Sequence, residues 1–158
     1  MMREFTVTDS DKCADLYRKV FTDYPWYDEW ISFDQVRYYL EELNLNPAFE
    51  GFVAFEGPDM VAACLGHSRS WWMGKEFFID EFYVENERQG NGVGTALMDY
   101  VEEELMKKDY RRLILTTDRE IPAENFYKRK GFNNKENRTV MTKEICGNQN
   151  LDTKSNQS

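Results

Sequence analysis

The chemistry-bearing stretch of this chain is ERQGNGVGTALM, residues 87–98, where Gly90, Gly92 and Gly94 run directly into a helix-forming segment. A helix N-terminus offers unpaired backbone N–H groups and the positive end of the helix dipole. Glycines there let the backbone approach an anion closely, so the pattern is typical of a phosphate cradle. A P-loop is excluded because no lysine or second glycine has the required spacing, and Thr95 replaces the last glycine of the dinucleotide fingerprint. A strand-to-helix turn without a ligand is the alternative interpretation.

The elements before this loop follow from hydrophobic periodicity. Residues 3–7 predict a short strand, and Asp9 or Ser10 can cap a helix that ends near Phe21. A capping box, Ser32 with the residue three positions later, predicts a helix to about residue 43. The run GFVAFEGPDMVAACLGHS predicts two strands joined by a Gly-Pro-Asp turn.

The elements after that turn complete an alternating pattern of strands and helices. EFFIDEFYV predicts a strand ending at Val84, and residues 95–108 have helical periodicity. RRLILTT predicts a buried strand, PAENFYKRK a short helix opened by Pro122, and TVMTKEI a last strand. The polar segment 147–158 is expected to be a disordered tail.

Composition limits the classes of function. The 158 residues are enough for one domain, and the net charge of −9 argues against nucleic acid as a partner, because phosphate binding needs clustered basic residues. The acidity either steers a cationic substrate or only maintains solubility. No apolar run is long enough for a membrane helix. The separated Cys13, Cys64 and Cys146 indicate reduced thiols in a cytoplasm, and the single His67 argues against a metal site.

Two motifs resemble those of the GNAT family of N-acetyltransferases. Gln89 to Gly94 reads Q-x-x-G-x-G, which is similar to the acetyl-CoA pyrophosphate loop of that family, and the neighbouring strand and helix are present. A second signature, A-x-x-F-Y-x-[KR]-x-G-F, follows at Ala123, Phe126, Tyr127, Arg129, Gly131 and Phe132. The resemblance implies an α/β fold over residues 1–146, with a mixed sheet of about six to seven strands, about four helices and a splayed strand pair for acetyl-CoA.

The resemblance also implies which residues bind acetyl-CoA. The backbone of Phe82, Tyr83 and Val84 would bond the pantetheine arm and polarise the thioester carbonyl. The pyrophosphate would be held by the amides of Gln89, Gly90, Asn91, Gly92, Val93, Gly94 and Thr95. Asn125, Tyr127 and Arg129 are assigned to the cofactor as well, although Arg129 and its lysine neighbours would also suit a solvated helix face. Many family members have an asparagine seven residues before the tyrosine, where this chain has Glu120.

Acetyl transfer to an amine requires two proton movements, and the resemblance implies residues for each. Tyr127 is the expected general acid, because a tyrosine is ordinarily protonated at neutral pH; a packing role is the alternative. Asp80 is the expected base or amine anchor and Glu81 the alternative, and strand alternation predicts that their side chains point to opposite faces. Residues 80–84 and 125–131 are also similar to the corresponding motifs of the diamine (spermidine/spermine) acetyltransferases. Either carboxylate could instead be an ordinary strand charge.

Two aromatic stretches are the candidates for recognising the acceptor. The expected substrate-binding residues are Tyr24, Trp26, Tyr27, Trp30, Trp71 and Trp72 together with Asp80, since rings and carboxylates suit a cation. The alternative is that the rings only pack, and His67 is interpreted as structural. We therefore expect transfer to a small cationic amine, polyamine- or aminoglycoside-like, in a ternary complex. A protein or peptide acetyltransferase and a non-catalytic acyl-CoA-binding module are the alternatives. No metal, nucleic acid or membrane is implied, and a homodimer stays open.

Overall fold

The computed structural model describes residues 1–22, 26, 28–29 and 32–146, in two compact units that divide after Thr116. The first unit contains all the strands. In chain order its elements are β1 (Met2–Glu4), η1 (Val7–Asp9), α1 (Ser10–Phe21), α2 (Phe33–Leu45), β2 (Phe49–Glu56), β3 (Asp59–Trp71), β4 (Gly74–Val84), η2 (Asn86–Arg88), α3 (Val93–Lys107) and β5 (Tyr110–Ile114). The second unit contains α4 (Pro122–Arg129).

The local signals predicted most element boundaries to within two residues. Ser32 accepts a hydrogen bond from the backbone N–H of Gln35 at 3.1 Å, so the predicted N-cap of α2 is present. The Gly-Pro-Asp turn joins β2 and β3 as expected, with Gly57 at φ 58°. A left-handed conformation of this kind is easily adopted only by glycine.

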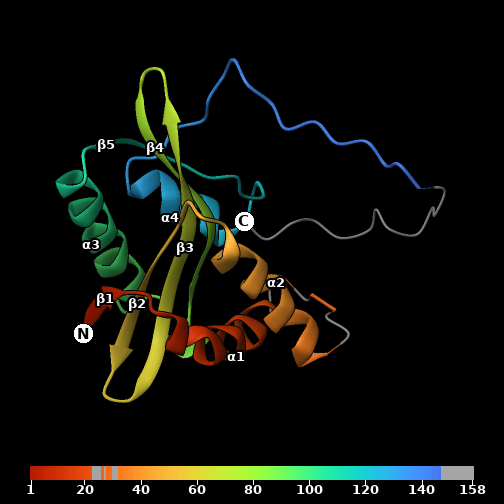
Figure 1. The fold of residues 1–158 in the computed structure, drawn as a ribbon, viewed down its shortest axis with the longest axis vertical. Helices are drawn as coiled ribbons and strands as arrows, with labels where there is room; N and C mark the ends of the chain where they lie inside the picture. The colour runs from red at the N-terminus through yellow and green to blue at the C-terminus, as the bar shows by residue number, and fades with distance from the viewer. Residues whose placement is uncertain (23–25, 27, 30–31, 147–158) are drawn as a thin grey trace. The chain divides into compact units, whose positions relative to one another are not determined.

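The five strands form one mixed sheet in the order β1-β2-β3-β4-β5. The first four strands are antiparallel, and β5 pairs with β4 in parallel. Buried side chains of α1 and α2 form one cluster with Val53, Ala63 and Leu65 of the sheet. On the opposite face Phe52 meets Tyr100 of α3, with ring centroids 6.1 Å apart. Helices therefore cover both faces, α1 and α2 on one and α3 on the other (Figure 1).

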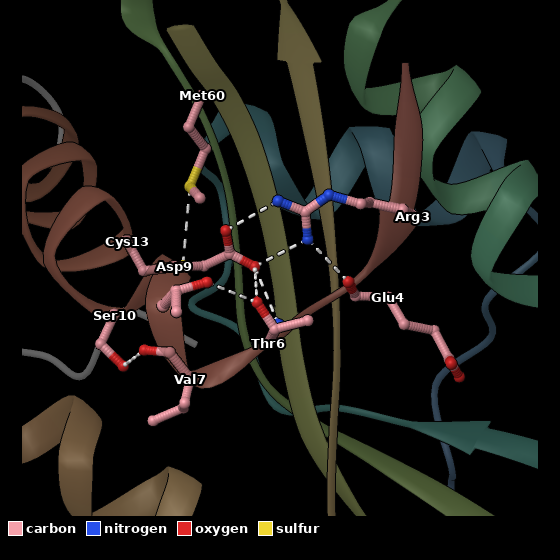
Figure 2. A network of polar contacts seen from close by, with 9 residues as sticks. Arg3, Glu4, Thr6, Val7, Asp9, Ser10, Cys13 and Met60 are labelled. Atoms are coloured by element: carbon pink, nitrogen blue, oxygen red, sulfur yellow. Dashed lines mark hydrogen bonds and ion pairs between the residues drawn. The ribbon is translucent and has the colours of Figure 1, made fainter. Parts of the chain in front are cut away.

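The link between β1 and α1 is fixed by a polar network around a buried aspartate. Both carboxylate oxygens of Asp9 accept hydrogen bonds from the guanidinium of Arg3 at 2.8 Å, and the Thr6 N–H donates to the same carboxylate at 2.8 Å. The Arg3 partner holds the pKa of Asp9 below its ordinary value although burial opposes this. Beside this network, Cys13, one turn into α1, contacts the thioether of Met60 in the core (Figure 2).

The parallel pair β4 and β5 separates partway along β4. Their last paired residues are Phe78 and Ile114, whereas β4 continues to Val84. Over residues 79–84, β4 pairs on one side with β3 and has no ladder partner in β5. The splayed strand pair expected for acetyl-CoA is therefore present.

The strand count is smaller than the sequence predicted. The described residues form five strands rather than six to seven, and TVMTKEI, predicted as the last strand, is not one of them. Val140, Met141 and Ile145 are exposed there, so no burial stabilises a pleated conformation. No helix within the described ranges has the length and apolarity needed to cross a membrane.

Candidate active site

The two carboxylates at residues 80 and 81 lie on one face of the sheet because β4 has a bulge. Leu65 of β3 pairs with Glu81 but Gly66 pairs with Ile79, so Asp80 is the extra residue. Leu65 and His67 share a face because they are two residues apart in a strand. Glu81 lies opposite Leu65 and Asp80 bonds His67. The expectation of opposite faces was therefore wrong, since the bulge interrupts the alternation.

Asp80 is the more accessible of the two carboxylates. Its Oδ2 lies 2.8 Å from Nδ1 of His67, and the two side chains are 28% and 32% exposed. The imidazole also stacks on Phe78, with ring centroids 5.3 Å apart and planes only 9° from parallel. Phe78 is the last residue of β4 that pairs with β5, so the His67–Asp80 pair lies where the two strands part.

Glu81 is enclosed in the core between the sheet and the helices. It is 2% exposed, its Oε2 accepts a hydrogen bond from the Tyr39 hydroxyl of α2, and its Oε1 has no partner among the described residues. Burial raises the pKa of Glu81 to about 8, with nearby Asp80 adding to the rise and the Tyr39 bond opposing it. The carboxyl is consequently protonated over much of the neutral range.

The glycine loop has a backbone conformation that residues with a side chain adopt only with strain. Gly90 and Gly92 both have φ 86°, and a Cβ built on either would meet open space. Gly92 is the N-cap of α3 and has no side chain to cap the following amides. Val93, Gly94 and Thr95 therefore open a 15-residue helix at its positive end. This arrangement fits the pyrophosphate of acetyl-CoA, because the amide donors are in place and the approach is open.

Side chains tie the loop to the end of β4. Nε2 of Gln89 donates to the Val84 carbonyl and to Oδ1 of Asn86, both at 3.0 Å. Tyr83 is buried and its hydroxyl donates to the Cys13 carbonyl at 2.9 Å, which anchors β4 to α1. The side chains of Gln89 and Tyr83 therefore stabilise the loop and the strand. Their backbone groups are the part that the resemblance assigns to acetyl-CoA. Phe82 and Asn91, also assigned to it, are half-buried and exposed respectively.

The second unit carries the remaining predicted residues. Tyr127 of α4 is buried, with ring centroids 5.4 Å from Phe126 and 5.6 Å from Phe132. Asn125 and Arg129 of the same helix are exposed. Gly131 ends the helix at φ 94°, which explains the glycine of the second motif. The motif is therefore an intact helix and C-terminal turn.

Of the aromatic residues assigned to the substrate, the structure describes Trp26, Trp71 and Trp72, and these lie apart from one another or from the carboxylates. Tyr24, Tyr27 and Trp30 lie outside the described residues. Trp26 packs on Phe21 at a centroid distance of 5.1 Å and belongs to the edge of the core.

The second aromatic stretch is the tip of the β3–β4 hairpin rather than a separate loop (Figure 1). Trp71 lies under the guanidinium of Arg69 at 4.1 Å, and Trp72 is 81% exposed. Trp71 pairs with Gly74, six residues before Asp80 and therefore about 20 Å away along the strand. The structure does not bring these two tryptophans to the carboxylates.

Sequence reasoning missed the partners of the carboxylates, His67 and Tyr39. Counting back along the hairpin from Trp72 places His67 opposite Phe78, so its proximity to residue 80 was predictable. The bulge had one signal, Gly66, which follows the apolar run 60–65 of β3. A Cβ there would collide with the Phe78 carbonyl oxygen and the Phe77 ring. Nothing in the sequence indicated the Tyr39 contact across 42 positions.

Comparisons with known proteins agree with this geometry. Residues 11–132 match the acetyltransferase (GNAT) family. Among solved structures, AAC(6')-Iy in complex with the bisubstrate analogue CoA-S-monomethyl-acetylneamine aligns with a TM-score of 0.70 and 16% identity, over 92% of this chain and 98% of that one. An aminoglycoside acetyltransferase from an uncultured soil metagenomic sample gives 0.70 and 16%, over 92% and 96%. The ribosomal-protein-alanine N-acetyltransferase of Brucella melitensis biovar Abortus 2308 gives 0.71 and 17%, over 90% and 99%. No curated protein matches the chain in sequence. At these identities the structural likeness shows the fold alone.

Proposed function

The chain belongs to the GNAT acetyltransferase family, and from that premise we propose that it acetylates a primary amine of a small cationic acceptor. The observation that supports this acceptor class is the carboxylate of Asp80, which is 28% exposed beside the point where β4 and β5 part. A carboxylate there suits an ammonium group, and the net charge of −9 would draw cations toward the protein. The motif similarity to diamine acetyltransferases favours the same class.

The acetyl donor would be held mainly by backbone groups. When bound, acetyl-CoA supplies a thioester with an electrophilic carbonyl carbon. The amides of Gln89 and Asn91 already donate to the carbonyls of Asn86 and Arg88, so the other amides of residues 90–95 would bind the pyrophosphate. The edge of β4 at Phe82, Tyr83 and Val84 would bind the pantetheine and polarise the carbonyl. Arg129 and Asn125 would bind the remaining polar groups of the cofactor.

Each of the two proton movements would have its own residue. An ammonium must lose a proton before nitrogen can attack, and the carboxylate of Asp80 supplies the negative charge for that step. Glu81 suits this role less well, because it is buried and its pKa is raised to about 8. Tyr127 would give a proton to the departing sulfur, since the phenol is ordinarily protonated at neutral pH.

The proposal is tested by acetyl-CoA-dependent thiol release against spermidine, putrescine, aminoglycosides, amino acids and peptides. We expect turnover on the cationic small molecules and a loss of about 100-fold in kcat for Tyr127→Phe. Asp80→Asn should raise KM for the amine as well as lower kcat. Turnover confined to peptides would replace the acceptor class with a protein or peptide substrate. Tight acetyl-CoA binding without any thiol release would favour the non-catalytic binding module.

A further inference from the structure

We propose that His67 accepts the proton of the acceptor ammonium, and that Asp80 is the residue that positions its imidazole. The inference deepens the proposed amine acetylation and rests on it. Nδ1 of His67 lies 2.8 Å from Oδ2 of Asp80. An ionised carboxylate can only accept, so in the neutral imidazole Nδ1 carries the proton and Nε2 carries the lone pair. The pair thus presents a base at Nε2, and Asp80 acts through it.

The position of the imidazole is fixed from two directions. The Asp80 carboxylate bonds its Nδ1 edge, and the Phe78 ring stacks on its face at 5.3 Å and 9°. Both partners are β4 residues, and Asp80 is the extra residue of the bulge, which turns its side chain toward His67. Phe78 also ends the β4–β5 ladder, which puts the imidazole at the opening of the splayed pair. With 32% of its side chain exposed, His67 can be reached by a ligand.

The neighbouring groups leave His67 as the accessible acceptor. Glu81 is 2% exposed and bonded to Tyr39, so a substrate ammonium cannot reach it without rearrangement. One oxygen of Asp80 already bonds the imidazole.

The electrostatic surroundings of the pair come from several elements. Burial raises the pKa values of Glu81 on the same strand, Tyr39 of α2 and Cys64 of β3. The charge of Asp80 raises each of these pKa values further. Arg69 shares the His67 face of β3, and its charge is paired with Glu76 of β4 at 2.9 Å. From β2 the residue paired with His67 is Phe49, which has no charge.

The proton balance is complete without another reactant. One proton passes from the ammonium to Nε2 of His67 and then to solvent. The nitrogen lone pair forms the carbon–nitrogen bond as the carbon–sulfur bond of the thioester breaks. The second proton lost from nitrogen on amide formation balances the proton that the departing sulfur takes up.

Kinetics of His67→Gln on an acceptor that the wild-type enzyme uses would test the inference. Glutamine can still donate to Asp80 but is not a base at neutral pH. We expect kcat to fall by about 100-fold or more, KM for acetyl-CoA to stay unchanged, and the acidic limb of the pH profile of kcat/KM to disappear. Ser70→Gln puts the same side chain at an exposed position of the same strand and should behave as wild type. A His67→Gln enzyme that keeps both its rate and its acidic limb overturns the inference.

A second measurement does not depend on turnover. His67 is the single histidine of the chain, so nitrogen NMR of the untagged protein reports its tautomer directly. We expect the proton on Nδ1 in the wild type, and loss of that preference in Asp80→Ala, which removes the acceptor. A proton on Nε2 in the wild type overturns the inference whatever the acceptor. If no amine is acetylated, the proposed function fails separately from this assignment.

Discussion

At the scale of single residues, Glu81 is the unusual group. A buried carboxyl with one unpartnered oxygen costs free energy, and the protein lowers that cost by holding the proton. The pKa of Glu81 is raised from 4.5 to about 8, so between these pH values the folded state binds a proton that the unfolded state has lost. Unfolding then becomes easier as pH rises through this window.

Glu81→Gln should remove that dependence. Glutamine can still accept the Tyr39 hydrogen bond but does not titrate. The stability of the variant relative to the wild type should therefore increase from pH 5 to pH 8. At about 1.4 kcal/mol per pH unit over these three units, the relative gain in free energy of unfolding is up to about 4 kcal/mol. Urea unfolding at both pH values measures it, with the exposed Glu103→Gln as control. Parallel pH dependences of Glu81→Gln and wild type would show that the carboxyl is not protonated in the fold.

At the scale of elements, the strands and helices that carry strong local signals were predictable, and the site geometry was only partly so. The capping box at Ser32 and the glycine loop each act within a few residues, so the sequence predicted α2 and the start of α3. The bulge at Asp80 depends on pairing between two strands, and alternation alone predicted the wrong face. The Tyr39–Glu81 contact depends on helix docking, which no local pattern encodes.

The glycine loop allows a matched test of its proposed role. Gly90 at φ 86° and Gly57 at φ 58° both face open space, so alanine at either position costs only the backbone strain of about 1 kcal/mol. Gly90→Ala should also place a methyl group where the pyrophosphate would approach. We expect calorimetry to show acetyl-CoA binding weakened about tenfold for Gly90→Ala but unchanged for Gly57→Ala. Equal affinities for the two variants would remove the loop from the cofactor site.

At the scale of the whole molecule, the family match indicates an acetyltransferase and the net charge favours a cationic acceptor. The GNAT match covers residues 11–132 and so includes both motifs, while the net charge of −9 favours a cationic partner over an anionic one. The first unit contains the sheet, the glycine loop, Asp80 and Glu81, and the second contains the helix of Tyr127. The solved structures, each under 20% identical to this chain, support the fold but do not identify the acceptor.

The central claim is tested most directly by following where the acetyl group goes. Acetyl-CoA labelled with carbon-13 in the acetyl group is incubated with the enzyme and an equimolar mixture of spermidine and a peptide of zero net charge with a free amino terminus. The products are identified by mass spectrometry. We predict labelled N-acetylspermidine as the main product, with a preference that weakens as salt screens the acidic surface. Label found mainly on the peptide, or released as acetate with spermidine unmodified, would contradict the account.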